Sequence, residues 1–151
     1  MRIALSADHA GYLLKNELVA KLTQQGHEVI DLGTHSAAPV DYPDSAQAVA
    51  AALADRQAER GIIVCGSGAG VSIAANKFPG IRAAVCHDTY TARQAVEHDD
   101  MNVLCLGARV IGPSLALDLA TAFLGARFTG EERHQRRLYR ILDFEKRFGK
   151  A

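Results

Sequence analysis

Residues 62–72, IIVCGSGAGVS, combine a thiol, a hydroxyl and a glycine-rich turn. Cys65 ends a short apolar run that fits a strand buried on both faces. Ser67 follows within a turn formed by Gly66, Gly68, Ala69 and Gly70, directly before a helical pattern. Such glycines let successive backbone N–H groups point inward at a helix start, where they stabilise phosphate or enolate oxygens. The stretch therefore offers a nucleophile or base, a hydroxyl and an anion-binding turn.

Two well-known phosphate loops do not match this turn. A P-loop needs Gly-Lys-Ser/Thr where the chain has Val71 and Ser72, and a dinucleotide-binding turn needs glycine near position 71. A nucleotide is therefore not the first ligand to expect. Taken alone, the segment also fits a tight turn in which Cys65 is only a small buried hydrophobic residue.

Composition predicts one domain spanning residues 1–151, because 151 residues with 48% hydrophobic content can bury a core. Lys+Arg and Asp+Glu are equal at 17 each, so no nucleic acid or membrane partner is expected. The apolar run at the N-terminus is too short for a signal peptide, and no segment approaches membrane-spanning length. These features favour a cytoplasmic protein.

The three cysteines, Cys65, Cys86 and Cys105, are odd in number and lack CxxC spacing. We therefore expect free thiols at or near strand ends, and neither a disulfide framework nor a zinc site.

Strand-like and helix-like segments alternate along the chain. The expected strands are residues 2–7, 27–32, 61–65, 81–86 and 102–106. The expected helices are residues 11–25, 45–60, 71–77, 89–97, 113–124 and 131–148. Right-handed crossovers then predict an α/β fold: a doubly wound, Rossmann-like sheet of five parallel strands, with helices on both faces and a C-terminal helix.

Ligands of such sheets bind at the carboxyl ends of the strands. Asp8 and His9 follow the first strand, the glycine turn follows the third, and residues 107–109 follow the fifth. Asp8 and His9 are consistent with a helix cap and a surface residue. They are equally suited to handling a sugar hydroxyl proton and binding a phosphate.

The final helix carries an excess of basic residues. Arg133 and Arg137 are four residues apart and share one face, where their repulsion is relieved if an anion sits between them. A solvated basic helix explains the same pattern. His98, taken alone, is an ordinary histidine at a helix C-terminus.

Six segments together strongly resemble the type B ribose-5-phosphate isomerases and their sugar-phosphate isomerase relatives: SADHAG (6–11), VIDLGT (29–34), DYP (41–43), CGSGAGVSIAANKFPGIRAAVC (65–86), HDDMNVLCLGARVIG (98–112) and RHQRR (133–137). The resemblance covers nearly the whole chain. It implies interconversion of ribose 5-phosphate and ribulose 5-phosphate through an enediolate, in a homodimer or dimer-based tetramer. It also implies that no metal or organic cofactor is used.

The resemblance assigns a role to individual residues. Cys65 looks like the base that moves a proton between C1 and C2, and Ser67 like the hydroxyl that helps proton transfer between O1 and O2. The amides of Gly66, Gly68, Ala69 and Gly70 would hold the enediolate. His98 and Asp8 resemble ring-opening residues, and Tyr42 resembles a residue that lines the sugar site. Phosphate contacts match His9, Arg109, Arg133 and Arg137.

Two positions distinguish this chain within the family. Some members carry a glutamate base after the last loop glycine, where this chain has Val71, so it resembles the members that use cysteine. The family usually reads His-Asn-Asp where this chain reads His98-Asp99-Asp100. A carboxylate at Asp99 accepts hydrogen bonds but donates none when ionised, so the preferred sugar stays open. A related tetrose or hexose phosphate, such as erythrulose 4-phosphate or allose 6-phosphate, is the alternative substrate.

Two other classes of protein share part of the pattern. A non-catalytic phosphate-binding module would use the glycine turn and basic helix but has no need of Cys65, Ser67 and His98 together. A cysteine hydrolase or phosphatase would place an arginine in the loop, and none lies between Gly66 and Gly70.

The expected topology separates the proposed residues. Cys65 follows the carboxyl end of a strand, whereas His98 and Asp99 precede the amino end of another. Strands of about five residues separate those edges by roughly 15 Å. We therefore expect an isologous dimer with active sites shared between subunits.

Overall fold

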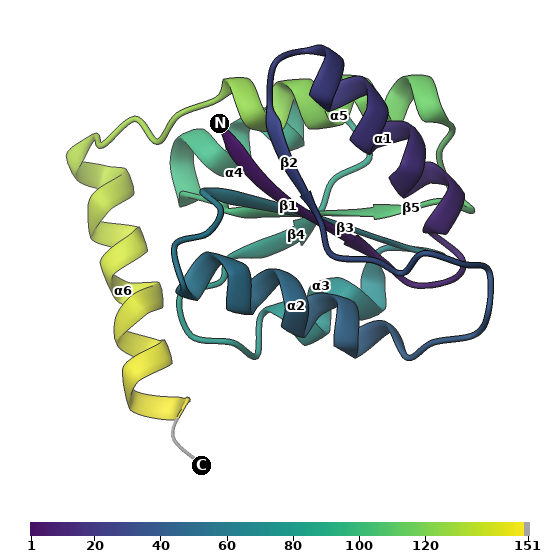
Figure 1. Ribbon diagram of the computed structural model, residues 1–151. Coiled ribbons are helices and arrows are strands. Elements are labelled where there is room, and N and C mark those ends of the chain that lie inside the picture. Colours follow the sequence, from purple (N-terminus) through teal and green to yellow (C-terminus); the bar gives the residue numbers. More distant parts are fainter. Residues whose placement is uncertain (150–151) are drawn as a thin grey trace.

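The structure, a computed structural model, describes residues 1–149 as a parallel sheet with helices on both faces (Figure 1). The strands are β1 (Arg2–Ala7), β2 (Glu28–Asp31), β3 (Arg60–Cys65), β4 (Ala83–Val85) and β5 (Val103–Gly107). The helices are α1 (Tyr12–Gln24), α2 (Tyr42–Ala54), α3 (Ala69–Ala75), α4 (Thr89–Asp99), α5 (Pro113–Gly125) and α6 (Glu132–Phe148). The strand order, β2-β1-β3-β5-β4, confirms the predicted doubly wound α/β sheet.

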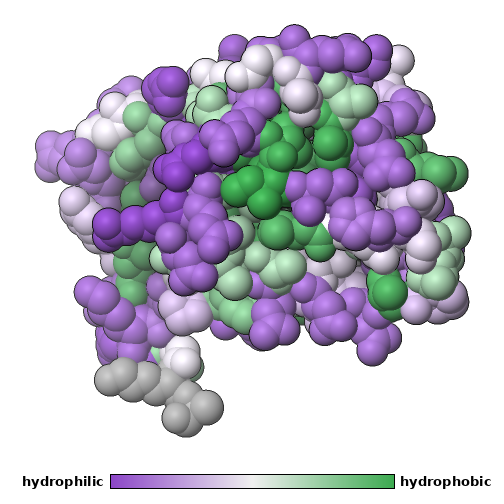
Figure 2. All heavy atoms as spheres, in the orientation of Figure 1, coloured by the Kyte–Doolittle hydropathy of each residue, from purple (hydrophilic) through white to green (hydrophobic). Residues whose placement is uncertain are grey.

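Each face of the sheet carries its own hydrophobic cluster. Ile3 and Leu5 of β1 pack with α1, α4 and α5, whereas Ala4 of β1 and Ile63 of β3 pack with α2 and α3. This alternation follows from the two-residue period of a strand buried on both faces. Figure 1 shows the two helical layers above and below the sheet. Figure 2 shows the hydrophobic residues of the same view gathered centrally, with hydrophilic residues above and below them.

Several element boundaries differ from the sequence prediction, and helix α3 lies two residues earlier at each end than expected. Helix α2 begins before residue 45, since Pro43 fits a first helical turn, and it ends before residue 60. It ends because Arg56 adopts the left-handed conformation, with φ of 57°. Strand β4 is also shorter than predicted, and the side chain of Asn76 bonds both the N–H and the carbonyl of its first residue, Ala83.

Helix α6 lies at one side of the molecule and meets α4 (Figure 1). Its start is connected to α4 by the Thr129 N–H, which donates to the Glu97 carbonyl at 3.0 Å. Within residues 1–149, no helix is both long enough and apolar enough to cross a membrane.

The chain changes faces of the sheet between β1 and β3. It leaves β1 through α1 on one face and reaches β3 through α2 on the other. The two strands are parallel neighbours, with Ala7 opposite Val64. Asp8 and Cys65 therefore emerge at adjacent strand ends, at the position where sheets of this type bind ligands.

A buried ion pair fixes α1 to the sheet near that point. Lys15 is fully buried, and its Nζ donates to both carboxylate oxygens of Asp31 at 2.7 Å. Asp31 also accepts the Gly33 N–H, and the Gly33 carbonyl accepts the Ala7 N–H at 2.7 Å. The pair is thus connected to the end of β1, directly before Asp8.

Substitution of Asp31 should lower the free energy of unfolding more than substitution of Lys15. Asp31→Ala leaves a buried ammonium without its carboxylate, so the free energy of unfolding should fall by about 3–5 kcal/mol. Lys15→Met replaces the ammonium with an apolar chain and leaves a partly exposed carboxylate that water can solvate, so the loss should be clearly smaller. Urea denaturation at one fixed protein concentration measures both. Equal losses would contradict this account.

Candidate active site

The glycine turn after β3 forms the centre of the candidate site. Cys65 is the last residue of β3, and its Sγ accepts the Gly68 N–H at 3.1 Å. The Gly68 backbone has φ of 83°, which favours glycine and turns that N–H back toward the sulfur. A donor aimed at sulfur stabilises negative charge on it. The Ser67 Oγ accepts the Ala69 N–H at 3.2 Å, so the hydroxyl hydrogen stays free to donate.

The turn rests directly on the end of β5. A Cβ atom at Gly107 would lie 2.6 Å from the Ser67 backbone, so the two chain segments approach this closely only because Gly107 has no side chain. Cys65 O accepts the Ala108 N–H at 2.8 Å, and Gly66 O accepts the Arg109 N–H at 3.0 Å. Backbone contacts therefore set the position of the loop, and the predicted loop residues lie together as expected.

Asp8 and His9 stand beside this turn, at the end of β1. Asp8 is 7% exposed, and its Oδ1 accepts the N–H groups of Ala10 and Gly11 at 2.9 and 3.0 Å. This oxygen holds the turn before α1, whose N-cap is Gly11, so Asp8 is not the helix cap considered from the sequence; Oδ2 is left for another partner. The His9 Nδ1 accepts the Val40 N–H at 3.2 Å, so its Nε2 carries a hydrogen available to a ligand.

Tyr42 and Arg109 complete the part of the site that this chain forms. The Tyr42 ring, at the start of α2, packs against Gly70. The Arg109 guanidinium lies beside Gly66. The carboxyl edge thus gathers an aromatic ring, a cation, a carboxylate and an imidazole around the loop. This combination can bind a small phosphorylated polyol and exchange protons with it.

Four predicted residues lie at the opposite edge of the sheet. His98 and Asp99 belong to the last turn of α4, which begins at the carboxyl edge and spans 11 residues, or about 16 Å. Arg133 and Arg137 lie on exposed positions of α6, where Arg133 pairs with Glu131. The structure therefore does not bring these four residues to Cys65 within one chain.

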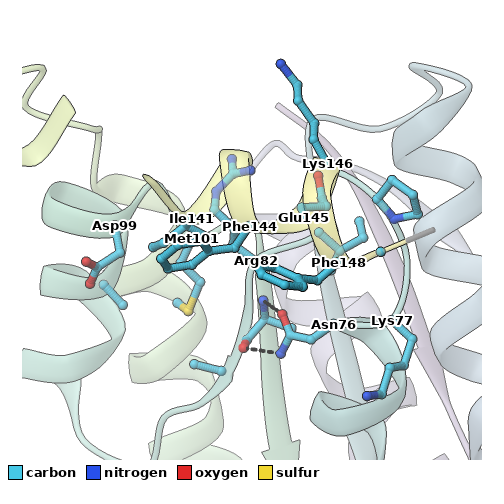
Figure 3. Close-up of a pocket in the computed structure, with 16 residues that line it drawn as sticks. Asn76, Lys77, Arg82, Asp99, Met101, Ile141, Phe144, Glu145, Lys146 and Phe148 are labelled. Carbon is cyan, nitrogen blue, oxygen red and sulfur yellow. Dashed lines mark hydrogen bonds between the residues drawn. The ribbon is translucent and has the colours of Figure 1, made fainter. Parts of the chain in front are cut away.

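A large cavity also lies away from the glycine turn. It has a volume of about 830 Å³ and lies between α6 and the end of the sheet formed by β4. Figure 3 shows Asp99 at one end of the view and Lys77 at the other, with Ile141, Phe144 and Phe148 of α6 between them. Met101 and Arg82 belong to the same lining. Most of this wall is apolar.

The cysteines other than Cys65 are poorly suited to ionic chemistry. Burial raises the pKa of Cys86 to about 11 and raises the pKa of Cys105 further. Cys105 also lies in the middle of β5, so the prediction of thiols near strand ends was wrong for that residue. All three cysteines are free. Residues 1–149 contain no cluster of three or more His, Cys, Asp or Glu side chains that could hold a metal ion.

Sequence reasoning missed His87, which follows β4. Its Nε2 accepts the Gly107 N–H at 3.0 Å and so helps to fix the strand end on which Ser67 rests. The signal available was weak, because a single histidine after a short strand is common at the surface.

Comparison with known proteins agrees with this geometry. The family model described as "Ribose/Galactose Isomerase" matches residues 3–141. The chain is 49% identical over 146 residues to ribose-5-phosphate isomerase B of Escherichia coli strain K12, covering 97% of both proteins. It is 46% identical over 132 residues to D-erythrulose-4-phosphate isomerase of Pectobacterium atrosepticum, covering 86% of both. The solved structure of ribose-5-phosphate isomerase B from Clostridium thermocellum has a TM-score of 0.95 and 50% identity, covering 98% of this chain and 99% of that one.

The thiols should differ in reactivity toward iodoacetamide at pH 8. Alkylation requires the thiolate, and the raised pKa values of Cys86 and Cys105 keep both protonated at that pH. Peptide mass spectrometry should find Cys65 modified first in the folded protein, and the other two only after unfolding in urea. Equally fast modification of Cys86 or Cys105 in the folded protein would contradict the assignment.

Proposed function

This chain belongs to the ribose/galactose isomerase family, and we propose that it interconverts ribose 5-phosphate and ribulose 5-phosphate with Cys65 as the base. The observation that carries the assignment is the Gly68 N–H aimed at the Cys65 sulfur, within a loop whose amides open α3. A phosphate-binding module or a cysteine hydrolase does not account for the family relationship together with this arrangement.

The central step is a proton transfer between neighbouring carbons. The Cys65 thiolate takes the proton from C2 of the open-chain aldose, which leaves an enediolate with its charge on oxygen. The loop amides of Gly66, Gly68, Ala69 and Gly70 stabilise that oxygen. The thiol then returns the proton to C1, while Ser67 helps to move a proton between O1 and O2 to complete the ketose. No net proton is gained or lost.

The cyclic sugar must open before this step. The C1–O4 bond breaks, O1 loses its proton, and the ring oxygen gains one. Asp8 is the proposed acceptor of the O1 proton, since its Oδ1 is committed to the Ala10 and Gly11 amides and Oδ2 remains free. Asp8 is proposed to pass this proton to the ring oxygen as the bond breaks, while His98 donates a hydrogen bond from its ring N–H to that oxygen. Tyr42 lines the sugar site, and four residues bind the phosphate: His9, Arg109, Arg133 and Arg137.

Because His98, Asp99, Arg133 and Arg137 lie at the far edge of the sheet, a second copy must supply them. We therefore propose a homodimer, or a tetramer built from such dimers, in which each site takes its Cys65 from one subunit and its His98 from the other. The sites are then shared between subunits.

Helix α6 offers the surface for this association. Its side chains Tyr139, Ile141, Phe144 and Phe148 are 44–75% exposed, although all are large and hydrophobic. Three of them also line the 830 Å³ cavity, which reaches Asp99. Apolar groups of this size favour burial, and a second copy that covers them comes close to the end of α4.

The residue that follows His98 bears on which sugar phosphate is preferred. Asp99 stands where the family usually has asparagine, so one donor of hydrogen bonds is replaced by a carboxylate. The similarity to a D-erythrulose-4-phosphate isomerase keeps a tetrose phosphate as the alternative, followed by a hexose phosphate. The three free thiols support a reducing compartment, and we propose the cytoplasm.

Removal of the proposed base should slow isomerisation strongly without unfolding the protein. Cys65→Ala should lower kcat by about 10²–10⁴-fold, the range for loss of a general acid or base. The assay measures aldose–ketose conversion of four-, five- and six-carbon sugar phosphates, with and without EDTA. The matched control is Cys105→Ala, a buried thiol outside the reaction. Near wild-type turnover in Cys65→Ala, or loss of activity in EDTA, would refute the metal-independent thiol mechanism.

A shared site should be rescued by mixing two inactive variants. In a heterodimer of Cys65→Ala and His98→Asn subunits, one site contains both lesions and the other contains none. After subunit exchange at equal amounts, about half of the dimers are heterodimers, so activity should recover to about a quarter of the wild-type value. Sedimentation verifies the dimer. Verified heterodimers without activity, or an active monomer, would show that the site is not shared.

A further inference from the structure

A glutamine one turn before His98 contacts its ring. The Gln94 Nε2 lies 2.8 Å from the His98 Nδ1, and the two residues are neighbours on one face of α4. Both side chains are half-buried. An amide nitrogen carries hydrogens but accepts no hydrogen bond, so Nδ1 must be the acceptor in this pair. A neutral imidazole has one donor and one acceptor, which places the remaining hydrogen on Nε2.

A second histidine holds the plane of the same ring. His134, on α6, stacks on His98 with ring centroids 4.0 Å apart and an angle of 22° between the planes. His134 is 2% exposed, and neither of its ring nitrogens has a hydrogen-bond partner within the described residues. Burial lowers the pKa of His134, which favours its neutral form in the stack. The stack fixes the plane of the His98 ring but does not decide which nitrogen faces outward.

We propose that Gln94 is a positioning residue that holds His98 as its Nε2-protonated tautomer, so that His98 presents an N–H donor to the sugar. This inference rests on the proposed role of His98 in ring opening. Gln94 binds Nδ1 from within its own helix and prevents the ring from turning over. The Nε2 hydrogen is then the only polar group of His98 free to meet an oxygen of the substrate. Gln94 itself touches neither the substrate nor the reacting atoms.

The test exchanges the donor for an acceptor of the same shape. In Gln94→Glu, the carboxylate requires a hydrogen on Nδ1, so it selects the other neutral tautomer or the imidazolium. Gln94→Met keeps the length but removes the strong hydrogen bond, so neither tautomer is enforced. Gln57→Glu adds the same charge at an exposed loop position and is the matched control.

The first measurement is a two-bond ¹H–¹⁵N spectrum of the histidine rings. The His98 signals are identified by their loss in His98→Asn. In the wild-type protein, His98 should show a protonated Nε2 and an unprotonated Nδ1. This pattern should change to a protonated Nδ1 in Gln94→Glu and to a tautomer mixture in Gln94→Met. A protonated Nδ1 in the wild type, or an unchanged pattern in Gln94→Glu, would overturn the proposal.

The second measurement is kinetic. With ribose 5-phosphate, at a pH where the spectrum shows an unprotonated Nε2 in Gln94→Glu, this variant should lower kcat about tenfold or more while KM changes less, because the phosphate contacts remain. Gln57→Glu should keep wild-type kcat. If His98→Asn is inactive but Gln94→Glu retains full kcat despite a changed tautomer, the positioning role is wrong. If His98→Asn is itself fully active, the ring-opening role of His98 fails, and the spectrum alone decides the tautomer assignment.

Discussion

Backbone hydrogen bonds between the ends of neighbouring strands hold the candidate site together. The Asp8 N–H bonds the Val64 carbonyl, and the N–H groups of Ala108 and Arg109 bond the carbonyls of Cys65 and Gly66. Segments that follow β1, β3 and β5 are thereby joined beyond the sheet itself. Because these bonds involve the main chain, most side chains at these positions do not affect them. Gly107 is an exception, since any side chain there would collide with the backbone of Ser67. The reactive groups are thus mounted on a rigid edge, as proton transfer in a fixed geometry requires.

The same topology that unites these segments separates the rest of the proposed machinery. A parallel sheet forces each connecting helix to run back across its face, so α4 begins beside the loop and delivers His98 to the other edge. Helix α6 then meets α4 there through the His98–His134 stack. The exposed apolar side of α6 and the cavity beside Asp99 lie at that edge too. The parallel arrangement of the strands therefore explains why His98 lies far from Cys65 and why it lies next to the surface proposed for a second copy.

The sequence predicted locally encoded elements better than features that depend on contacts between separate elements. Strand β1 was predicted with its observed bounds because its apolar pattern is continuous. Helix α2 was displaced because Pro43 and Arg56 act through local backbone geometry that periodicity does not register, and strand β4 is shorter than expected. The pairs Lys15–Asp31 and Gln94–His98 escaped notice for different reasons. The first joins residues from two elements, and the second is a common helical spacing with no special composition.

By itself, the sequence determined the element order, the glycine turn with its thiol, and the resemblance that links these residues to sugar-phosphate isomerisation. Such features depend on residue types and short spacings, which determine local conformation directly. Only the tertiary structure decided which candidates meet. It placed Asp8, Tyr42 and Arg109 around Cys65 and set His98 apart from them. It also showed that the Gln94 amide donates to the His98 Nδ1. Those relations arise from strand order and helix packing, where contacts join residues far apart in the chain and no single segment specifies the outcome.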